Sequence, residues 1–209
     1  MVGGKSKLLS RSSNNKFPMA SQASGKPVLT ANLENAPTAG NAKLLRCPTD
    51  TLRRLRYLHE AEIITLFTPL IPHSPVTTLA KDMDPFEPLG RALPRQVRHV
   101  PYRLDYGMTE THGDFLPACG AVAIVICATT NVLSYNTQAF ERQLQFARDV
   151  VGKSRGNITT ADIPIVLLLV ADDLRMQAYA DATYDFPTLV TINNYTTTAL
   201  TNAVRVLFG

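Results

Sequence analysis

Ala121–Thr129, AVAIVICAT, is a continuous apolar run rich in valine and isoleucine. A strand carries such a run only when both of its faces are covered, as in the middle of a parallel sheet. Ile163–Ala171, IPIVLLLVA, repeats the pattern further along the chain. Between the two runs, residues 137–151 place their apolar side chains on one face of an amphipathic helix. This strand–helix–strand order predicts a parallel βαβ unit with a right-handed crossover.

Shorter segments extend this pattern on both sides. We expect further strands at residues 62–68, 97–102 and 189–192, and further helices at 49–60, 85–93, 111–119 and 196–208. The alternation of strands and helices predicts an α/β fold. Specifically, we expect a three-layer α/β/α sandwich with a mostly parallel sheet of about five strands.

Charge divides the 209-residue chain into two parts. Residues 1–56 hold ten lysines and arginines against two acidic residues, whereas the remainder is mildly acidic. Residues 1–45 are rich in Ser, Asn, Gly, Ala, Pro and Lys and have no sustained apolar period, so we interpret them as a disordered basic leader. A mitochondrial leader is the alternative, because no acidic residue precedes Glu34. Residues 46–209 are then one α/β domain.

The composition also bears on location and partners. Three cysteines cannot all pair, and no Cys/His cluster with metal-ligand spacing is present, so we expect reduced thiols, a cytoplasmic location and no metal. No apolar run approaches membrane-spanning length. The basic leader lacks a pattern of aromatic residues between its charges. We therefore expect neither a membrane nor a nucleic acid as a partner.

Ligands of open α/β sheets bind beyond the carboxyl ends of the strands. This rule directs attention to three segments, at residues 101–112, 129–134 and 172–173. The first contains the pattern Gly-x-Thr-x-Thr-His. Its members and the preceding tyrosine are candidates for a substrate or interface loop: Tyr102, Gly107, Thr109, Thr111 and His112.

Each candidate also has a purely structural interpretation. His112 is a candidate proton shuttle or sugar contact, but a histidine in the first turn of a helix is more often packed or hydrogen-bonded. Thr111-His-Gly-Asp114 has the form of a capping box, with Thr109 or Thr111 as the cap. Asp172 and Asp173 are weaker candidates for acid–base or metal chemistry, because adjacent carboxylates often mark a solvated strand end or a helix N-terminus.

No other motif in the sequence indicates a catalytic activity. Gly-Lys-Ser occurs at residues 4–6 and 152–154, but a phosphate-binding loop needs an earlier glycine and a helix that begins after it. The earlier glycine would stand at residue 147, which is alanine, and Gly152 lies at the end of the predicted helix instead of before a helix. Serine-hydrolase and HExxH patterns are also missing. We therefore assign no catalytic residue and predict no cofactor.

A family resemblance rests on several of these segments. Arg98-His-Val-Pro-Tyr102, Gly107-Met-Thr-Glu-Thr-His112 and the strand AVAIVICAT resemble the C-terminal domain of family 3 glycoside hydrolases, in the fungal β-N-acetylglucosaminidase-like branch. The segments at residues 64–70, 86–93, 186–190 and 195–200 also resemble that domain. The resemblance spans residues 61–209, with Asp173 where the family pattern has proline.

The resemblance implies that catalysis takes place elsewhere. In that family an N-terminal TIM barrel holds the nucleophilic aspartate and, in this branch, an Asp/His acid–base pair. A TIM barrel needs about 250 residues, so none of those catalytic residues can be assigned to this chain. The resemblance implies a partner barrel in cis or in trans and a role at its interface for the Gly-x-Thr-x-Thr-His loop.

Three functional hypotheses follow from these observations. The first is a stand-alone or truncated C-terminal domain of a β-N-acetylglucosaminidase-like hydrolase, inactive alone. The second is a nucleotide-free, GTPase-like scaffold or interaction module. The third is a small independent enzyme that uses His112 with Asp172 or Asp173.

Overall fold

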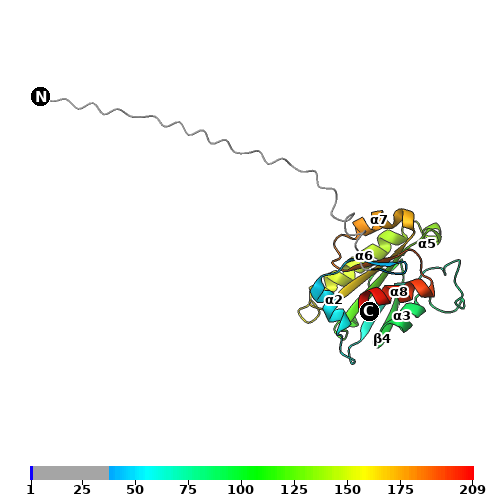
Figure 1. Ribbon diagram of the computed structural model, residues 1–209, viewed down its shortest axis with the longest axis horizontal. Helices are drawn as coiled ribbons and strands as arrows, with labels where there is room; N and C mark the ends of the chain where they lie inside the picture. Colours follow the sequence, from blue (N-terminus) through cyan, green and yellow to red (C-terminus); the bar gives the residue numbers. More distant parts are fainter. Residues whose placement is uncertain (2–37) are drawn as a thin grey trace.

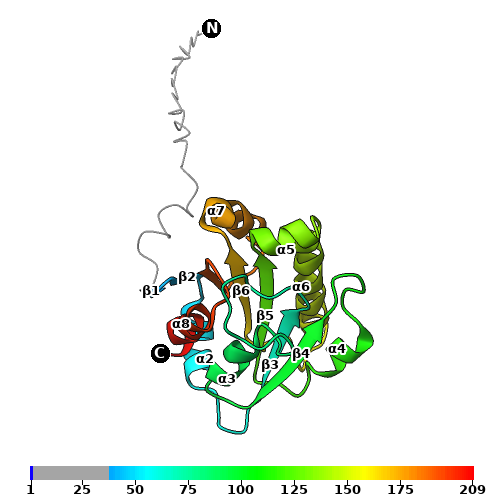
Figure 2. The same cartoon turned by 90° about the vertical axis from the view of Figure 1, so that its right-hand side faces the viewer.

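A seven-stranded sheet forms the centre of the protein in the computed structural model, which describes residues 1 and 38–209 (Figures 1 and 2). The strand order is β1-β2-β7-β6-β5-β3-β4. The strands are β1 (Thr38–Ala39), β2 (Ala42–Arg46), β3 (Ile64–Pro69), β4 (Val97–Tyr102), β5 (Ala121–Ala128), β6 (Ile165–Ala171) and β7 (Leu189–Ile192). The five strands from β3 to β7 pair in parallel, and β1 and β2 are antiparallel.

Helices cover both faces of the sheet. One layer contains α2 (Thr49–Arg56), α3 (Glu87–Ala92) and α8 (Thr197–Phe208), and α2 and α3 each pack on α8 (Figure 1). The other contains α4 (Glu110–Asp114), α6 (Ala139–Arg155) and α7 (Asp173–Ala182). The short α5 (Thr130–Tyr135) follows β5 at the carboxyl edge of the sheet (Figure 2). The expected three-layer α/β/α sandwich is confirmed.

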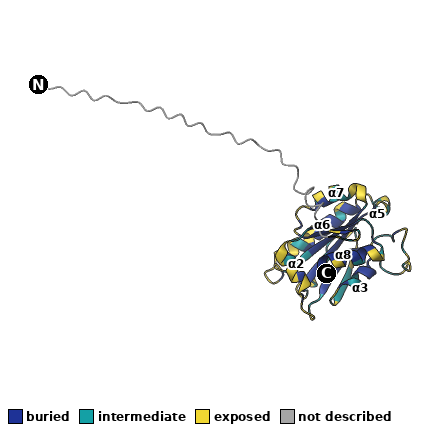
Figure 3. Ribbon diagram, viewed as in Figure 1, coloured by how far each residue is buried: buried dark blue, intermediate teal, exposed yellow. Residues whose placement is uncertain are grey.

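The central strand β5 is buried on both faces. Val125 and Cys127 belong to the apolar cluster beneath α2, α3 and α8, whereas Ile124 and Ile126 belong to the cluster beneath α6. All four side chains are fully buried, and the sheet is the buried layer of the molecule (Figure 3). Two covered faces account for the continuous apolar run, because neither set of alternating side chains faces solvent.

The chain changes direction across the sheet at β3. From β3 it passes to β4 on one side, then returns to β5 on the other side and continues to β6 and β7. Such a reversal of strand order is a topological switch point. In doubly wound sheets, ligands bind there, beyond the carboxyl ends of the two strands that flank it. Here those ends are the segments after Pro69 in β3 and after Ala128 in β5.

The interpretation of residues 38–45 as part of a disordered leader is wrong. These residues form β1 and most of β2, and β2 pairs antiparallel with β7. Leu44 packs into the cluster on one face of the sheet and Leu45 into the cluster on the other. This short hairpin raises the strand number from the expected five to seven. The rest of the predicted leader, residues 2–37, lies outside the described residues.

Several helix boundaries differ from those expected. The helix predicted at 111–119 ends at Asp114, since Leu116 precedes Pro117 and a residue before proline is disfavoured in helical geometry. The helix expected to end near Gly152 continues to Arg155, so the second Gly-Lys-Ser lies inside α6 and not in a loop that opens a helix. Helices α5 and α7 were not predicted. No helix among the described residues has both the length and the apolarity needed to cross a membrane.

Candidate functional site

The switch point at the carboxyl edge is filled by a hydrogen-bonded network of the protein itself. The Nδ2 of Asn131, in the first turn of α5, donates to the hydroxyl of Tyr195 at 2.6 Å and to the carbonyl of His73 at 3.3 Å. The hydroxyl of Tyr195 donates to the carbonyl of Pro72 at 3.0 Å. Thr129, which follows β5, donates to Oδ1 of Asn131 at 2.7 Å. Segments that follow β3, β5 and β7 therefore meet at this point.

Tyr195 is held as a neutral hydrogen-bond donor in this network. Its ring stacks on Phe86 with 5.7 Å between centroids, and the residue is 2% exposed. Burial raises the pKa of Tyr195 to about 12, against the opposing effect of the Asn131 side chain. The phenol accordingly stays protonated at neutral pH and donates to Pro72. The network ties the loop after β3 to the segment before α8.

Asp172 and Asp173 lie at the end of β6 and bind different partners. Asp172 occupies the N-cap position of α7, and its Oδ2 accepts hydrogen bonds from the backbone N–H and the hydroxyl of Thr130. Asp173, in the first turn of α7, accepts from Nδ2 of Asn193 at 3.3 Å. Carboxylates are favoured at a helix N-terminus, where unpaired N–H groups give a partial positive charge. Among the residues that the structure describes, no group of three or more His, Cys, Asp or Glu side chains is arranged to hold a metal.

The Gly-x-Thr-x-Thr-His segment forms a turn and a capped helix. Gly107 has φ +63°, a conformation that side chains with a Cβ rarely adopt. Thr109, not Thr111, is the N-cap of α4. The Nδ1 of His112, three residues on, accepts from the backbone N–H of Thr109 at 3.0 Å and lies 2.7 Å from its hydroxyl. The capping box therefore runs from Thr109 to His112, and Thr111 is exposed.

The His112 ring is enclosed by aromatic side chains. It meets Phe67 edge-on at 5.8 Å and Phe146 edge-on at 5.2 Å between centroids, and the residue is 9% exposed. Burial lowers the pKa of His112, partly offset by the carbonyl of Pro101. Because Nδ1 accepts a hydrogen bond, the proton of the neutral ring is assigned to Nε2. The imidazole is thus a neutral group that fixes the loop.

Tyr102 belongs to the same aromatic cluster. Its ring stacks on Phe146 at 3.7 Å with an interplanar angle of 5°, and its hydroxyl donates to the carbonyl of Val125 at 2.8 Å. Burial raises the pKa of Tyr102 well above its usual value. The structure thus brings Tyr102, Thr109 and His112 together. Within the described part of the chain, no hydrogen bond or ion pair joins His112 to Asp172 or Asp173.

The polar residues that organise the carboxyl edge are not among the residues that sequence patterns identify. Asn131 and Tyr195 were not singled out, although Asn131 lies within the segment 129–134 that the strand-end rule selected. Gln143 was also missed. Its buried amide accepts from the N–H of Cys127 at 2.7 Å and donates to the carbonyl of Cys127 at 2.8 Å. A polar residue in the apolar stripe of a helix was the available signal for Gln143.

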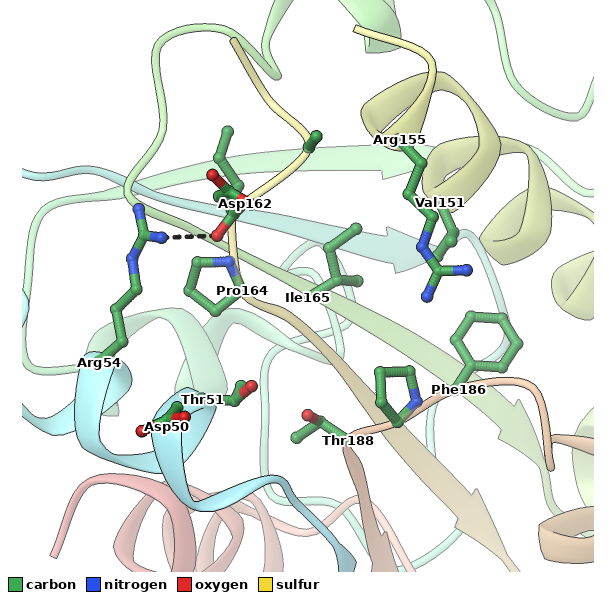
Figure 4. Close-up of a pocket in the computed structure, with 13 residues that line it drawn as sticks. Asp50, Thr51, Arg54, Val151, Arg155, Asp162, Pro164, Ile165, Phe186 and Thr188 are labelled. Carbon is green, nitrogen blue, oxygen red and sulfur yellow. Dashed lines mark hydrogen bonds between the residues drawn. The ribbon is translucent and has the colours of Figure 1, made fainter. Parts of the chain in front are cut away.

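A cavity of about 380 Å³ lies at the opposite, amino-terminal edge of the sheet (Figure 4). Arg54 from α2 and Arg155 from α6 lie on two sides of it, and Ile165 lies between them. Asp50 and Asp162 also line it, so its charges are mixed. Arg54 donates to the carbonyl of Asp162 at 2.6 Å. Balanced charge gives this cavity no clear preference for a ligand of either sign.

Comparisons with known proteins find similarity to this chain among solved structures. No protein-family model matches it, and neither does any curated protein. Among solved structures it is similar to a glycoside hydrolase family 3 β-N-acetylglucosaminidase from Paenibacillus sp. str. FPU-7, with 12% identity, a TM-score of 0.48 and 79% of this chain covered. It is also similar to a β-glucosidase from Listeria innocua in complex with gluconolactone, with 18% identity, a TM-score of 0.42 and 79% of this chain covered. The chain spans 28% and 22% of the lengths of these two proteins.

Proposed function

We propose that this chain is an accessory α/β domain of a glycoside hydrolase, similar to the C-terminal domain of family 3 enzymes of the β-N-acetylglucosaminidase-like branch. It does not cleave glycosidic bonds alone and works beside a TIM-barrel domain in cis or in trans. The resemblance of residues 61–209 supports the family. One structural observation carries the non-catalytic role: His112, the best candidate acid or base, is a buried helix-capping residue.

Glycoside hydrolysis places two acid–base or nucleophilic groups on either side of the scissile bond. His112 is enclosed by Phe67 and Phe146. Asp172 and Asp173 are engaged at the N-terminus of α7 by Thr130 and Asn193. The three groups therefore support the fold where they stand, and this favours the accessory role over a small independent enzyme.

The carboxyl edge offers the surface for the barrel. Figures 1 and 2 both place α5 and α7 beside each other at this edge, and the bond between Thr130 and Asp172 joins their first turns. Tyr135 at the end of α5 is 78% exposed, and Leu174 in α7 is 99% exposed. We propose that the partner barrel covers these two side chains, because contiguous apolar surface is typically buried at an interface.

Sequencing the messenger RNA that carries this coding region tests the proposal first. We expect a reading frame for a family 3 barrel on the same transcript or at the same locus. The purified barrel should then bind this chain, and Leu174→Arg should weaken binding at least about tenfold. Ile158→Arg is the matched control, because Ile158 is also 93% exposed but follows α6 in the loop before β6. A genome that encodes no family 3 barrel, or a barrel that does not bind this chain, would contradict the proposal.

A further inference from the structure

We propose that the groove between α2, α3 and α8 binds a small organic anion that has an apolar body and a carboxylate or phosphate head. This site lies in the helical layer that covers one face of the sheet, away from the carboxyl edge. The three helices lie side by side, with the C-terminus between them (Figure 1). The inference does not depend on the proposed role beside a barrel.

The groove has the size and charge that such a ligand needs. It encloses about 370 Å³, within the range of about 300–1,000 Å³ typical of ligand pockets. Three arginines line it, Arg56 from α2, Arg95 after α3 and Arg205 from α8. None of the lining residues that the structure describes has an acidic side chain. Positive charge therefore exceeds negative charge there.

The arginines are held in place without being neutralised. Arg95 donates through Nε and Nη2 to the carbonyl of Leu58 at 2.9 and 2.8 Å, and through Nη1 to that of Pro94 at 2.9 Å. Arg56 donates through Nε to the carbonyl of Leu207 at 3.3 Å. Carbonyl acceptors orient a guanidinium but leave its full charge for a ligand. Within the described part of the chain, the Arg205 side chain has no hydrogen bond or ion pair, and a planar guanidinium matches carboxylate and phosphate oxygens.

Apolar side chains complete the groove. Leu55, Val204 and Phe208 line it beside the arginines. A second cavity of about 400 Å³ shares Ala92 and Thr201 with it and continues across the contact of α3 with α8. An apolar body lying on these side chains would gain free energy from burial, which a bare inorganic anion could not. The cavity in Figure 4 differs, because two aspartates line it together with its two arginines.

Titration calorimetry on the full chain tests the inference with phenyl phosphate, benzoate, inorganic phosphate and benzylamine. We expect phenyl phosphate or benzoate to bind at least about tenfold more tightly than inorganic phosphate, and benzylamine not to bind. The comparison of phenyl phosphate with benzoate identifies the preferred head group. Arg205→Ala should weaken that binding at least about tenfold, with partial recovery in Arg205→Lys, which restores the charge without the planar fork.

Arg155→Ala is the matched control, because it removes a positive charge from the other cavity. Its affinity should stay within about twofold of that of the unchanged protein. Equal losses in the two variants would mean nonspecific attraction and overturn the inference. Inorganic phosphate that binds as tightly as the better of phenyl phosphate and benzoate would overturn it as well. Binding of benzylamine, or no binding of either aromatic anion up to about 10 mM, would also overturn it.

Discussion

His112 makes two stabilising interactions at the residue scale, a helix cap and an aromatic contact. His112→Ala removes both, so we expect a loss of about 1–2 kcal/mol in the free energy of unfolding. Urea denaturation followed by circular dichroism measures it. Thr111→Ala, at the exposed neighbour, should change stability by less than about 0.5 kcal/mol. Equal effects of the two substitutions would contradict the capping role.

The lowered pKa of His112 also predicts a pH dependence. Burial favours the neutral ring, so the unfolded chain binds this proton more readily than the folded protein does. The stability that His112 contributes is therefore present above its unfolded pKa of about 6.5 and is lost as the pH falls below it. Denaturation at about pH 5 and pH 7.5 should show a smaller difference in His112→Gln than in the unchanged protein. The same difference in both proteins would contradict this assignment.

Cys127 differs from the other two cysteines in its burial. It is fully buried in β5, and burial raises its pKa to about 12, whereas Cys47 and Cys119 are partly exposed. A thiol reagent needs an accessible thiolate. Mass spectrometry after labelling at neutral pH should therefore find Cys127 unmodified in the folded protein and modified in denaturant. Labelling of Cys127 at the rate of Cys47 under native conditions would contradict the buried central strand.

At the scale of elements, β2 is an integral part of the sheet. Leu44 and Leu45 are each 6% exposed and pack on opposite faces. Leu44→Ala and Leu45→Ala should each lower the free energy of unfolding by about 2–4 kcal/mol, since each leaves a cavity. Lys43→Ala, at the exposed residue that precedes Leu44 in β2, should have little effect. Thermal unfolding of the three variants tests this, and three equally stable variants would refute the pairing of β2 with β7.

The elements also show what local sequence can predict. The apolar runs of β5 and β6 identify central strands because covering two faces demands apolar residues at every position. Strand β2 contains just five residues, and its burial depends on pairing with β7, which is distant in sequence. Helix α7 escapes prediction because Leu174 faces solvent and Ala180 is its one buried residue among ten. Met176 and Tyr179 pack beside Ala180 but are only partly buried, so α7 carries a weak apolar pattern.

The same limit applies to the candidate site. The capping box of Thr109 and His112 can be predicted from local sequence, because an N-cap residue and its partner are three residues apart. The contact of Asn131 with Tyr195 and the contact of Tyr195 with Pro72 join residues far apart in the chain. They arise because β3 and β5 are neighbours in the sheet and because the segment before α8 reaches their ends. Local sequence patterns do not reveal the order of the strands in the sheet, so these contacts could not be predicted from them.

At the scale of the whole molecule, the central claim is that this α/β domain is non-catalytic alone. Asp172 and His112 form hydrogen bonds at helix N-termini, and α5 and α7 expose Tyr135 and Leu174 at the carboxyl edge. The most informative measurement is therefore an assay of catalytic activity on the isolated chain.

That measurement is the hydrolysis of an aryl N-acetylglucosaminide by the purified chain, at high protein concentration and with His112→Ala in parallel. We predict no turnover above the rate in buffer for either protein, because no pair of groups is positioned across a glycosidic bond by the residues described. Turnover by the unchanged chain that disappears in His112→Ala, while circular dichroism shows an intact fold, would contradict the account.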